Sequence, residues 1–297
     1  MPIKIISDSS CDISNDDAKK LDIEVVPFYV SFDGLKYIKE REDIATRDFY
    51  KTMVENPDCF PKSSLPSIQD YMETFDKYAS EGFDIICICI TTKFSGSFNS
   101  ATNAAQLVRE KYPNIKISII NSMINTVLQG LLVREVVRMN ENNLSFEEIV
   151  EKIEEIKTTG RIIFTIGSMS YLAHGGRMGK VLTGAASTLR ILPIITLKDG
   201  EIFPSGIVRS RKASLTKVLE KVNEHFTKNN FDINDYSLAV GYGYDIDEGK
   251  IFHDDFTKSA GSIGNKCPIA FEQIGSTIAV HTGPHPLGVA LIKKYDR

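Results

Sequence analysis

Hydroxyl side chains gather in two loops of the sequence, each just before a predicted helix. The loop 91–97 reads Thr-Thr-Lys-Phe-Ser-Gly-Ser and follows the most apolar predicted strand. Its hydroxyls, its glycine and the free N–H groups of a helix start together favour an anion. The proline-stiffened loop 60–67 carries Ser63 and Ser64, and its fixed backbone can aim Ser63 at the same anion. The plainer alternatives are that Ser97 only caps its helix and that 60–67 is a solvated loop.

Three further segments place cations beside glycine, proline or serine. Residues 172–180 contain Arg177 among several glycines, which is typical of a surface that receives phosphate or carboxylate. Residues 281–288 begin with His281, which we expect at the end of a strand; the plainer interpretation is a structural histidine. Residues 208–212 include two arginines, and alone they are explained as a solvated loop.

Several familiar catalytic and binding motifs are absent from the sequence. Gly179-Lys180 lacks the rest of a Walker loop, and Gly241-Tyr242-Gly243 lacks the third glycine of a dinucleotide fingerprint. The sequence also contains no paired-histidine zinc helix, no two-cysteine metal knuckle and no Gly-x-Ser-x-Gly elbow. We therefore expect no catalytic residue and no metal, but an anion site of neutral hydroxyls, which suits a carboxylate better than a phosphate.

The amino-acid composition argues against several classes of protein. The 297 residues are 42% apolar, which is enough to bury a ligand as well as a core, and the formal net charge of −4 argues against nucleic-acid binding. The N-terminus does not resemble a signal peptide, and no apolar run is long enough to cross a bilayer, so we expect no stable membrane insertion. Five scattered cysteines fit a reducing compartment, and a cytoplasmic location is expected.

Short runs of isoleucine and valine alternate with amphipathic stretches, which predicts an α/β fold. In the first half, the sequence favours a largely parallel sheet with flanking helices. Strands are expected at 3–6, 23–32, 84–90 and 115–120, helices at 47–55 after a cap at Thr46, from Ser67, at 97–110 and from Ser145, and a hairpin turn at Asp33-Gly34.

The second half is expected to form a mixed sheet with helices. We predict a strand from Arg161, a short helix, a helix at 181–190, a hairpin turning at Asp199-Gly200, a helix near 214–227, a strand at 238–241, another helix, and closing strands at 269–274 and 277–281. The polar segment before Ser145 suggests two α/β domains, 1–155 and 156–297.

Together these segments resemble the DegV family, to which the fatty-acid-binding subunits of bacterial fatty acid kinase belong. The resemblance covers essentially the whole chain. Its motifs, in order, are Ser7-Asp8-Ser9-Ser10, Ser63-Ser64-Leu65-Pro66-Ser67, Phe94-Ser95-Gly96-Ser97, Tyr171-Leu172 to Gly175-Gly176-Arg177-Met178-Gly179, Pro193 to Gly200, Arg209-Ser210-Arg211-Lys212 and His281-Thr282-Gly283-Pro284.

The resemblance implies a cytoplasmic, non-catalytic protein that buries a long-chain fatty acid of the palmitate or oleate class, without a cofactor. It also implies a partner, the catalytic subunit of fatty acid kinase, and a product used in phospholipid synthesis. By position, Ser63, Ser95 and Gly96 bind the carboxylate, with Ser64, Arg177, His281 and Thr282 near the head group and Arg177, Arg209 and Arg211 at the kinase-docking surface.

The chain departs from the family pattern at a few positions. Ser63 stands where threonine is frequent, Leu65 where glutamine is usual, Phe94 where leucine is common and His285 where a small residue is expected, and 122–129 differs from a serine-rich helix start. A serine at 63 still donates a hydrogen bond, whereas the other three changes bear on chain preference and partner recognition.

Two alternative functions are also compatible with parts of the sequence. The first is an enzyme of the dihydroxyacetone kinase type, in which His281 holds a small keto sugar covalently. The second is a transcriptional or interaction protein, which no helix-turn-helix signature or basic recognition helix supports.

Overall fold

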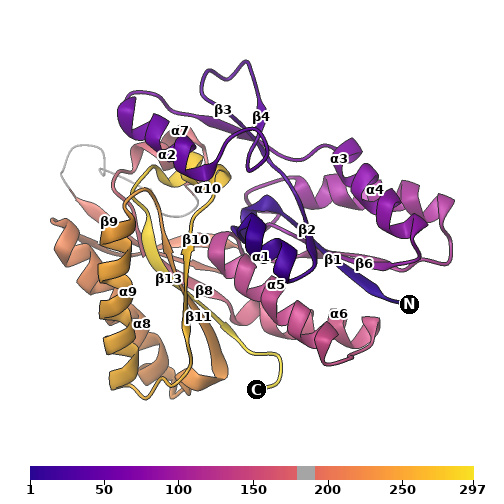
Figure 1. Cartoon of the computed structure of the whole chain (residues 1–297). Coiled ribbons are helices and arrows are strands. Elements are labelled where there is room, and N and C mark those ends of the chain that lie inside the picture. Colours follow the sequence, from indigo (N-terminus) through magenta and orange to yellow (C-terminus); the bar gives the residue numbers. More distant parts are fainter. Residues whose placement is uncertain (179–190) are drawn as a thin grey trace.

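The computed structural model describes residues 1–178 and 191–297 (Figure 1). Its first sheet has four parallel strands in the order β2-β1-β6-β7. These are β1 (Ile3–Asp8), β2 (Ile23–Val26), β6 (Asp84–Cys89) and β7 (Ile117–Asn121). Every residue of β6 is buried, as expected for a central parallel strand covered on both faces, and Cys87 and Cys89 lie in this core. The parallel sheet predicted for the first half is confirmed.

A second, small sheet was not predicted. It has the antiparallel order β4-β3-β5, formed by β3 (Tyr29–Ser31), β4 (Ile38–Lys39) and β5 (Lys62–Ser64). The single strand expected at 23–32 is therefore wrong, because the chain leaves the first sheet after Val26 and pairs elsewhere from Tyr29. The predicted hairpin turn is confirmed, with Gly34 at φ +73°, a region that glycine enters without steric cost.

The third sheet is mixed, as predicted, and has the order β10-β9-β8-β13-β11-β12. Its strands are β8 (Arg161–Thr165), β9 (Leu192–Lys198), β10 (Glu201–Val208), β11 (Tyr236–Tyr242), β12 (Ile269–Gln273) and β13 (Leu287–Lys293). The pair β11–β12 is parallel and the other pairs are antiparallel. The β9–β10 hairpin turns at Asp199-Gly200, both at positive φ, as a two-residue hairpin requires.

The helices connect and cover these sheets. They are α1 (Asn15–Lys20), α2 (Thr46–Glu55), α3 (Ile68–Ser80), α4 (Ser97–Lys111), α5 (Thr126–Glu141), α6 (Phe146–Ile156), α7 (Ser170–His174), α8 (Arg211–Asn229), α9 (Ile246–Ser262) and α10 (Ser276–Thr282), with 3-10 turns η1 (Ser9–Cys11), η2 (Lys157–Thr159) and η3 (Ile233–Asp235).

Local capping explains several of the helix starts. Ser67 and Asp70 form a capping box at α3, and Ser145 with Glu148 forms another at α6, as the sequence predicted. The predicted start at Thr46 is one residue late, because Ala45 is the N-cap of α2 and makes no side-chain bond. Ser97 is not a cap either: Gly96 holds that position in α4.

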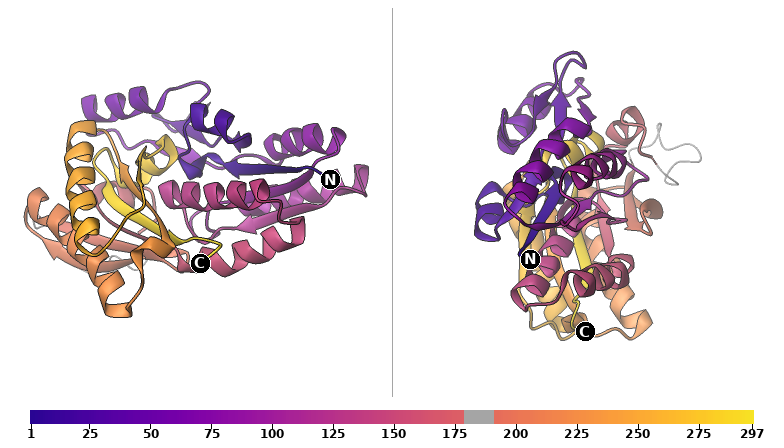
Figure 2. Two further views of the ribbon diagram at one scale, coloured as in Figure 1. Left: turned by 60° about the horizontal axis from the view of Figure 1, so that its bottom comes forward. Right: turned by 90° about the vertical axis from the view of Figure 1, so that its right-hand side faces the viewer.

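The layers meet at α5. Helices α3 and α4 pack on one face of the four-stranded sheet, and α8 and α9 on one face of the six-stranded sheet. Helix α5 contacts β1 of the first sheet and β11 and β13 of the third, so it lies between the two (Figures 1 and 2). A single apolar cluster accordingly joins residues of both sheets to α5. The predicted division into 1–155 and 156–297 stays a prediction.

The last part of the chain corrects the sequence prediction. Residues 277–281 form part of α10 and not a strand. The closing strand is β13, which was not predicted and which pairs with both β8 and β11 at the centre of the six-stranded sheet. The helix expected at 181–190 lies outside the described residues.

Candidate functional site

A cavity lies between the sheets and opens beside the three-stranded sheet. It holds about 200 Å³ of space that the centre of a water molecule can reach. A single buried water needs only roughly 10–15 Å³ by this measure, so the cavity has room for a much longer molecule. Its walls come from the three-stranded and six-stranded sheets, from the loop that follows β6, from the start of α5 and from α10.

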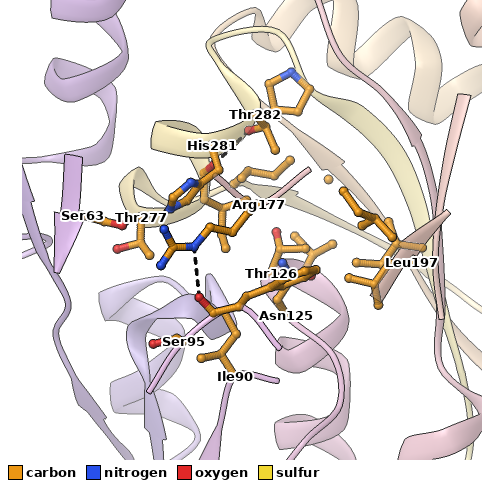
Figure 3. A pocket seen from close by; sticks show the side chains of 18 of the residues that line it. Ser63, Ile90, Ser95, Asn125, Thr126, Arg177, Leu197, Thr277, His281 and Thr282 are labelled. Carbon is orange, nitrogen blue, oxygen red and sulfur yellow. Dashed lines mark hydrogen bonds between the residues drawn. The ribbon is translucent and has the colours of Figure 1, made fainter. Parts of the chain in front are cut away.

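The cavity wall is mainly apolar, and several of its polar groups lie together at one side. The apolar lining comprises Phe28, Leu65, Ile90, Phe94, Val127, Ile162, Phe164, Leu172, Leu197, Ile202, Ile274, Ile278 and Pro286, and two glycines, Gly241 and Gly288. Figure 3 shows Ser63, His281, Arg177 and Ser95 along one side and Leu197 across the cavity. This separation suits a ligand with one polar end and one long apolar end.

The loop that carries Ser95 leaves the carboxyl end of β6 and turns into α4. The backbone N–H groups of Phe94 and Ser95 both donate to Thr91 O, and the N–H of Ser97 donates to Ser95 Oγ at 3.1 Å. No described residue accepts a hydrogen bond from the Ser95 hydroxyl, which lines the cavity. Ser95 is therefore free to donate to a ligand.

A buried carboxyl group holds this loop from behind. Asp8, at the end of β1, is fully buried and accepts from Ile90 N at 2.9 Å and Ser97 Oγ at 2.7 Å. Its other oxygen accepts from Ser10 Oγ at 2.6 Å and Gln129 Nε2 at 2.9 Å. Burial raises the pKa of Asp8, and these four bonds oppose that rise. The ends of β1 and β6 and the start of α4 are thus tied together behind Ser95.

Ser63 and His281 meet across the cavity mouth. Ser63 lies on β5 and His281 near the end of α10, and Ser63 Oγ lies 3.1 Å from His281 Nε2. A side chain at Gly175 would place its Cβ 2.2 Å from His281 Nδ1, so the ring fits only because this position is glycine. Within the described part of the chain, that Nδ1 has no hydrogen-bond partner.

The imidazole of His281 is neutral at ordinary pH. Burial lowers its pKa, and the positive charge of Arg177 lowers it further, to about 4. A neutral ring offers one donor and one acceptor, so His281 orients hydrogen bonds in this site and contributes no positive charge.

Arg177 supplies the positive charge at the mouth. It is exposed, its Nε donates to Phe94 O at 3.2 Å and its Nη1 to Gly175 O at 2.8 Å. No carboxylate pairs with it among residues 1–178 and 191–297. Its guanidinium therefore joins the Ser95 loop to the His281 side of the cavity and keeps an unpaired charge there.

The other residues predicted near the head group, Ser64, Thr282 and Gly96, differ in whether they can bind a ligand. Ser64 is exposed and lines the mouth. Thr282 lines the cavity, but its hydroxyl donates to Ile278 O at 3.0 Å and is already satisfied. Gly96 lies beside the mouth as the N-cap of α4 and is not part of the lining.

Besides Arg177, the other two arginines expected at the docking surface, Arg209 and Arg211, lie at the start of α8. Arg209 is exposed, and no described residue pairs with it. Arg211 instead forms a two-bond ion pair with Glu248 of α9, at 2.8 and 2.7 Å. Neither lines the cavity. Arg209 is thus the more accessible of the two.

Three polar lining residues were missed by the sequence reasoning: Asn125, Thr126 and Thr277. Thr126 has φ +52°, unusual for a β-branched residue, and its hydroxyl donates to the buried carboxyl of Asp12. Thr277 lies in a segment predicted as a strand, which concealed its place at a helix start. The divergent stretch 122–129 was the one sequence signal that pointed to Asn125 and Thr126.

Two negative findings hold for the residues that the structure describes. No group of three or more histidine, cysteine or acidic side chains is arranged to hold a metal ion. No helix among them combines the length and apolarity that crossing a bilayer demands.

Comparisons with known proteins identify the family. A family model described as "Uncharacterised protein, DegV family" matches residues 2–294. A DegV domain-containing protein of Clostridium acetobutylicum is 32% identical over 293 residues, covering 98% of this chain and 97% of that protein.

Solved structures agree with this match. A structure from Eubacterium ventriosum, described as a fat acid (stearic acid)-binding protein, superposes with a TM-score of 0.93 at 41% identity and covers 99% of both chains. DegV of Bacillus subtilis, described as a fatty acid binding protein, has the same fold, with a TM-score of 0.84, 23% identity and coverage of 99% of this chain and 100% of that one. The chain belongs to the DegV family.

Proposed function

We propose that this protein binds a long-chain fatty acid in the cavity and presents its carboxyl group to a separate kinase. The protein itself is non-catalytic in this proposal and works in the cytoplasm. The kinase transfers a phosphoryl group from ATP onto the bound carboxylate, and the acyl phosphate serves phospholipid synthesis.

The observation that carries the binding proposal is the division of the cavity into an apolar body and a hydroxyl-lined mouth. Burying about ten methylene groups contributes roughly 8 kcal/mol before ordering costs. The polar groups then need only to orient the acid. The stearic-acid-binding description of the Eubacterium ventriosum protein supports the same ligand class.

The mouth suits a carboxylate that stays close to solvent. Ser95 has a free hydroxyl proton, Ser63 shares a hydrogen bond with His281, and Arg177 adds an unpaired positive charge. A carboxylate at this place accepts hydrogen bonds and avoids the large cost of deep burial. Its oxygens then face outward, where a kinase can reach them.

Organic extraction of the purified protein followed by mass spectrometry tests the binding proposal. We expect one equivalent of a fatty acid, which would also report the preferred chain. An empty extract, together with no binding of added palmitate or oleate, would contradict it. A covalent adduct on His281 after incubation with dihydroxyacetone would then favour the keto-sugar enzyme.

Docking to the kinase is tested separately with the two arginines. Arg209→Ala is expected to lower the rate of acyl-phosphate formation by the partner kinase while fatty-acid affinity and melting temperature stay unchanged. Arg211→Ala should lower that rate too, but also some stability, because it leaves Glu248 without its ion-pair partner. Normal phosphorylation of both variants would exclude this docking surface.

A further inference from the structure

Glu40 is a buried carboxyl group outside the cavity lining. It follows β4 and is 1% exposed. It accepts hydrogen bonds from Thr277 N and Thr277 Oγ1, both at 2.8 Å, and from Ser9 Oγ. No described lysine or arginine forms an ion pair with it. Burying a carboxyl group costs free energy unless hydrogen bonds satisfy its oxygens. The residues that donate to Glu40 therefore indicate which part of the structure it stabilises.

Two of the hydrogen bonds to Glu40 come from Thr277, near the start of the helix that carries His281. Thr277 lies in the first turn of α10, whose N-cap, Gly275, has no side chain to satisfy the free N–H groups of that turn. Glu40 supplies this cap from 237 residues away in the sequence. Thr277 and His281 are four residues apart, hence on one face of α10, and both line the cavity.

The opposite end of α10 is tied to the same small sheet. His281 meets Ser63 on β5, β5 pairs with β3, and β3 pairs with β4, which leads into Glu40. The N–H of Glu40 also donates to Phe28 O at 3.0 Å, beside the start of β3. The three-stranded sheet therefore holds α10 at both ends, through Glu40 at Thr277 and through Ser63 at His281.

We infer that Glu40 is a positioning residue for the head-group site: by capping α10 it fixes His281 against Ser63 in the geometry that receives a carboxyl group. This inference rests on the proposed function of the cavity. Glu40 touches no ligand in this role, because it lies behind Thr277 and not in the cavity wall.

A second buried acid, Asp12, lies near Glu40 at the start of α10. A side chain at Gly275 would place its Cβ 2.6 Å from Asp12 Oδ1 and 3.7 Å from Glu40 Oε2, so both carboxyl groups flank the start of α10. Burial raises the pKa of Glu40, and the hydrogen bonds from Ser9 and Thr277 oppose that rise. Glutamine has the same shape as Glu40 and keeps one oxygen that can accept from Thr277 N–H, so Glu40→Gln is expected to preserve the cap of α10.

The test compares Glu40→Ala and Glu40→Gln with a matched control, Glu135→Ala. Glu135 of α5 is also a buried acid, 2% exposed, which accepts from Ser237 Oγ at 2.7 Å and pairs with Arg138 at 2.7 Å; it does not line the cavity, and none of its hydrogen bonds within the described part of the chain reaches α10. Two quantities are measured in each protein: the dissociation constant for oleate and the NMR titration of the His281 ring.

For Glu40→Ala we expect oleate to bind roughly tenfold more weakly, since the buried Thr277 N–H loses its partner and α10 shifts. The His281 titration should move from about pH 4 toward the ordinary value as its ring becomes more hydrated. Glu40→Gln should stay within about twofold of the natural protein, and Glu135→Ala should lower stability without moving His281.

A milder variant covers the case in which Glu40→Ala does not fold. Ser9→Ala removes one of the hydrogen bonds to Glu40, together with the acceptor of Phe28 N–H beside β3, and should shift the His281 titration in the same direction by a smaller amount. An unchanged His281 titration and unchanged oleate affinity in the Glu40 or Ser9 variants would overturn the inference while leaving fatty-acid binding intact. If the natural protein binds no fatty acid, the proposed function fails, and the His281 titration still decides the role of Glu40.

Discussion

The two sides of the cavity mouth are built in different ways. The Ser95 side is a short loop between β6 and α4, held by Asp8 at the end of the neighbouring strand β1. The His281 side depends on contacts between distant parts of the chain, since Ser63 and His281 are 218 residues apart. One side follows from the geometry of a parallel sheet, and the other exists only once the three-stranded sheet and α10 have come together.

A single turn of the chain joins the two sides. In η1, Ser10 Oγ donates to Asp8, which holds the Ser95 loop, and Ser9 Oγ donates to Glu40, which caps α10. Adjacent serines thus support opposite sides of one site. This explains physically why the Ser7-Asp8-Ser9-Ser10 motif accompanies the hydroxyl loops although it does not line the cavity.

The largest expected effect comes from breaking the support of the Ser95 side. Asp8→Ala leaves the buried Ile90 N–H without its partner and removes one hydrogen bond each from Ser97 and Gln129, so we expect the free energy of unfolding to fall by about 3 kcal/mol or more. Chemical denaturation measures this. A loss of unfolding free energy smaller than that of Glu40→Ala would show that Asp8 supports the Ser95 side less strongly than Glu40 supports the His281 side.

The next largest effect concerns oleate binding and distinguishes the hydroxyl of Ser95 from that of Ser63. Ser95→Ala should weaken oleate binding by roughly fivefold to tenfold, because its free proton is available to the ligand. Ser63→Ala should weaken it less, since the Ser63 hydroxyl already shares a hydrogen bond with His281. Calorimetric titration of both variants, with melting temperatures as a control for folding, gives the order. The reverse order would place the carboxylate nearer to β5.

His281 is expected to make the stability of the folded protein depend on pH. The pKa of His281 is about 4 in the folded protein, whereas an unfolded chain binds this proton near pH 6.5. Its contribution to stability is therefore complete above about pH 6.5 and is lost as pH falls toward 4, by at most about 1.4 kcal/mol per pH unit. Denaturation at several pH values should show this extra loss in the natural protein relative to His281→Gln.

The buried acids Asp8, Asp12 and Glu40 are present in both of those proteins, so their opposite pH dependence cancels in the difference. Their raised pKa values favour stability at low pH, and this contribution falls as pH rises through those values. Identical slopes for the two proteins would mean that His281 is not buried as a neutral ring.

The smallest effect is expected at Ser64. Its hydroxyl is exposed at the mouth and has no hydrogen-bond partner among the described residues. Ser64→Ala should change oleate affinity by less than about twofold, since a solvated hydroxyl contributes little net free energy. The same titration measures it, and a loss as large as that of Ser95→Ala would mean that the carboxylate extends further toward solvent.

The sequence by itself determined the α/β class, the parallel and mixed sheets, and the Ser95 loop. These features depend on local signals: the apolar run of β6, the capping residues Ser67 and Ser145, and the Asp199-Gly200 turn. Because loops at the carboxyl ends of parallel strands form ligand sites, the sequence alone indicates the Ser95 loop as an anion site.

Tertiary structure alone decided the His281 side. Residues 277–281 form a helix although their β-branched residues favour a strand, because Glu40 caps the first turn and the apolar face of α10 packs against the three-stranded sheet and α2. The sequence showed Ser63, Thr277 and His281 as separate residues. Their meeting depends on contacts over more than 200 residues, which no local pattern encodes.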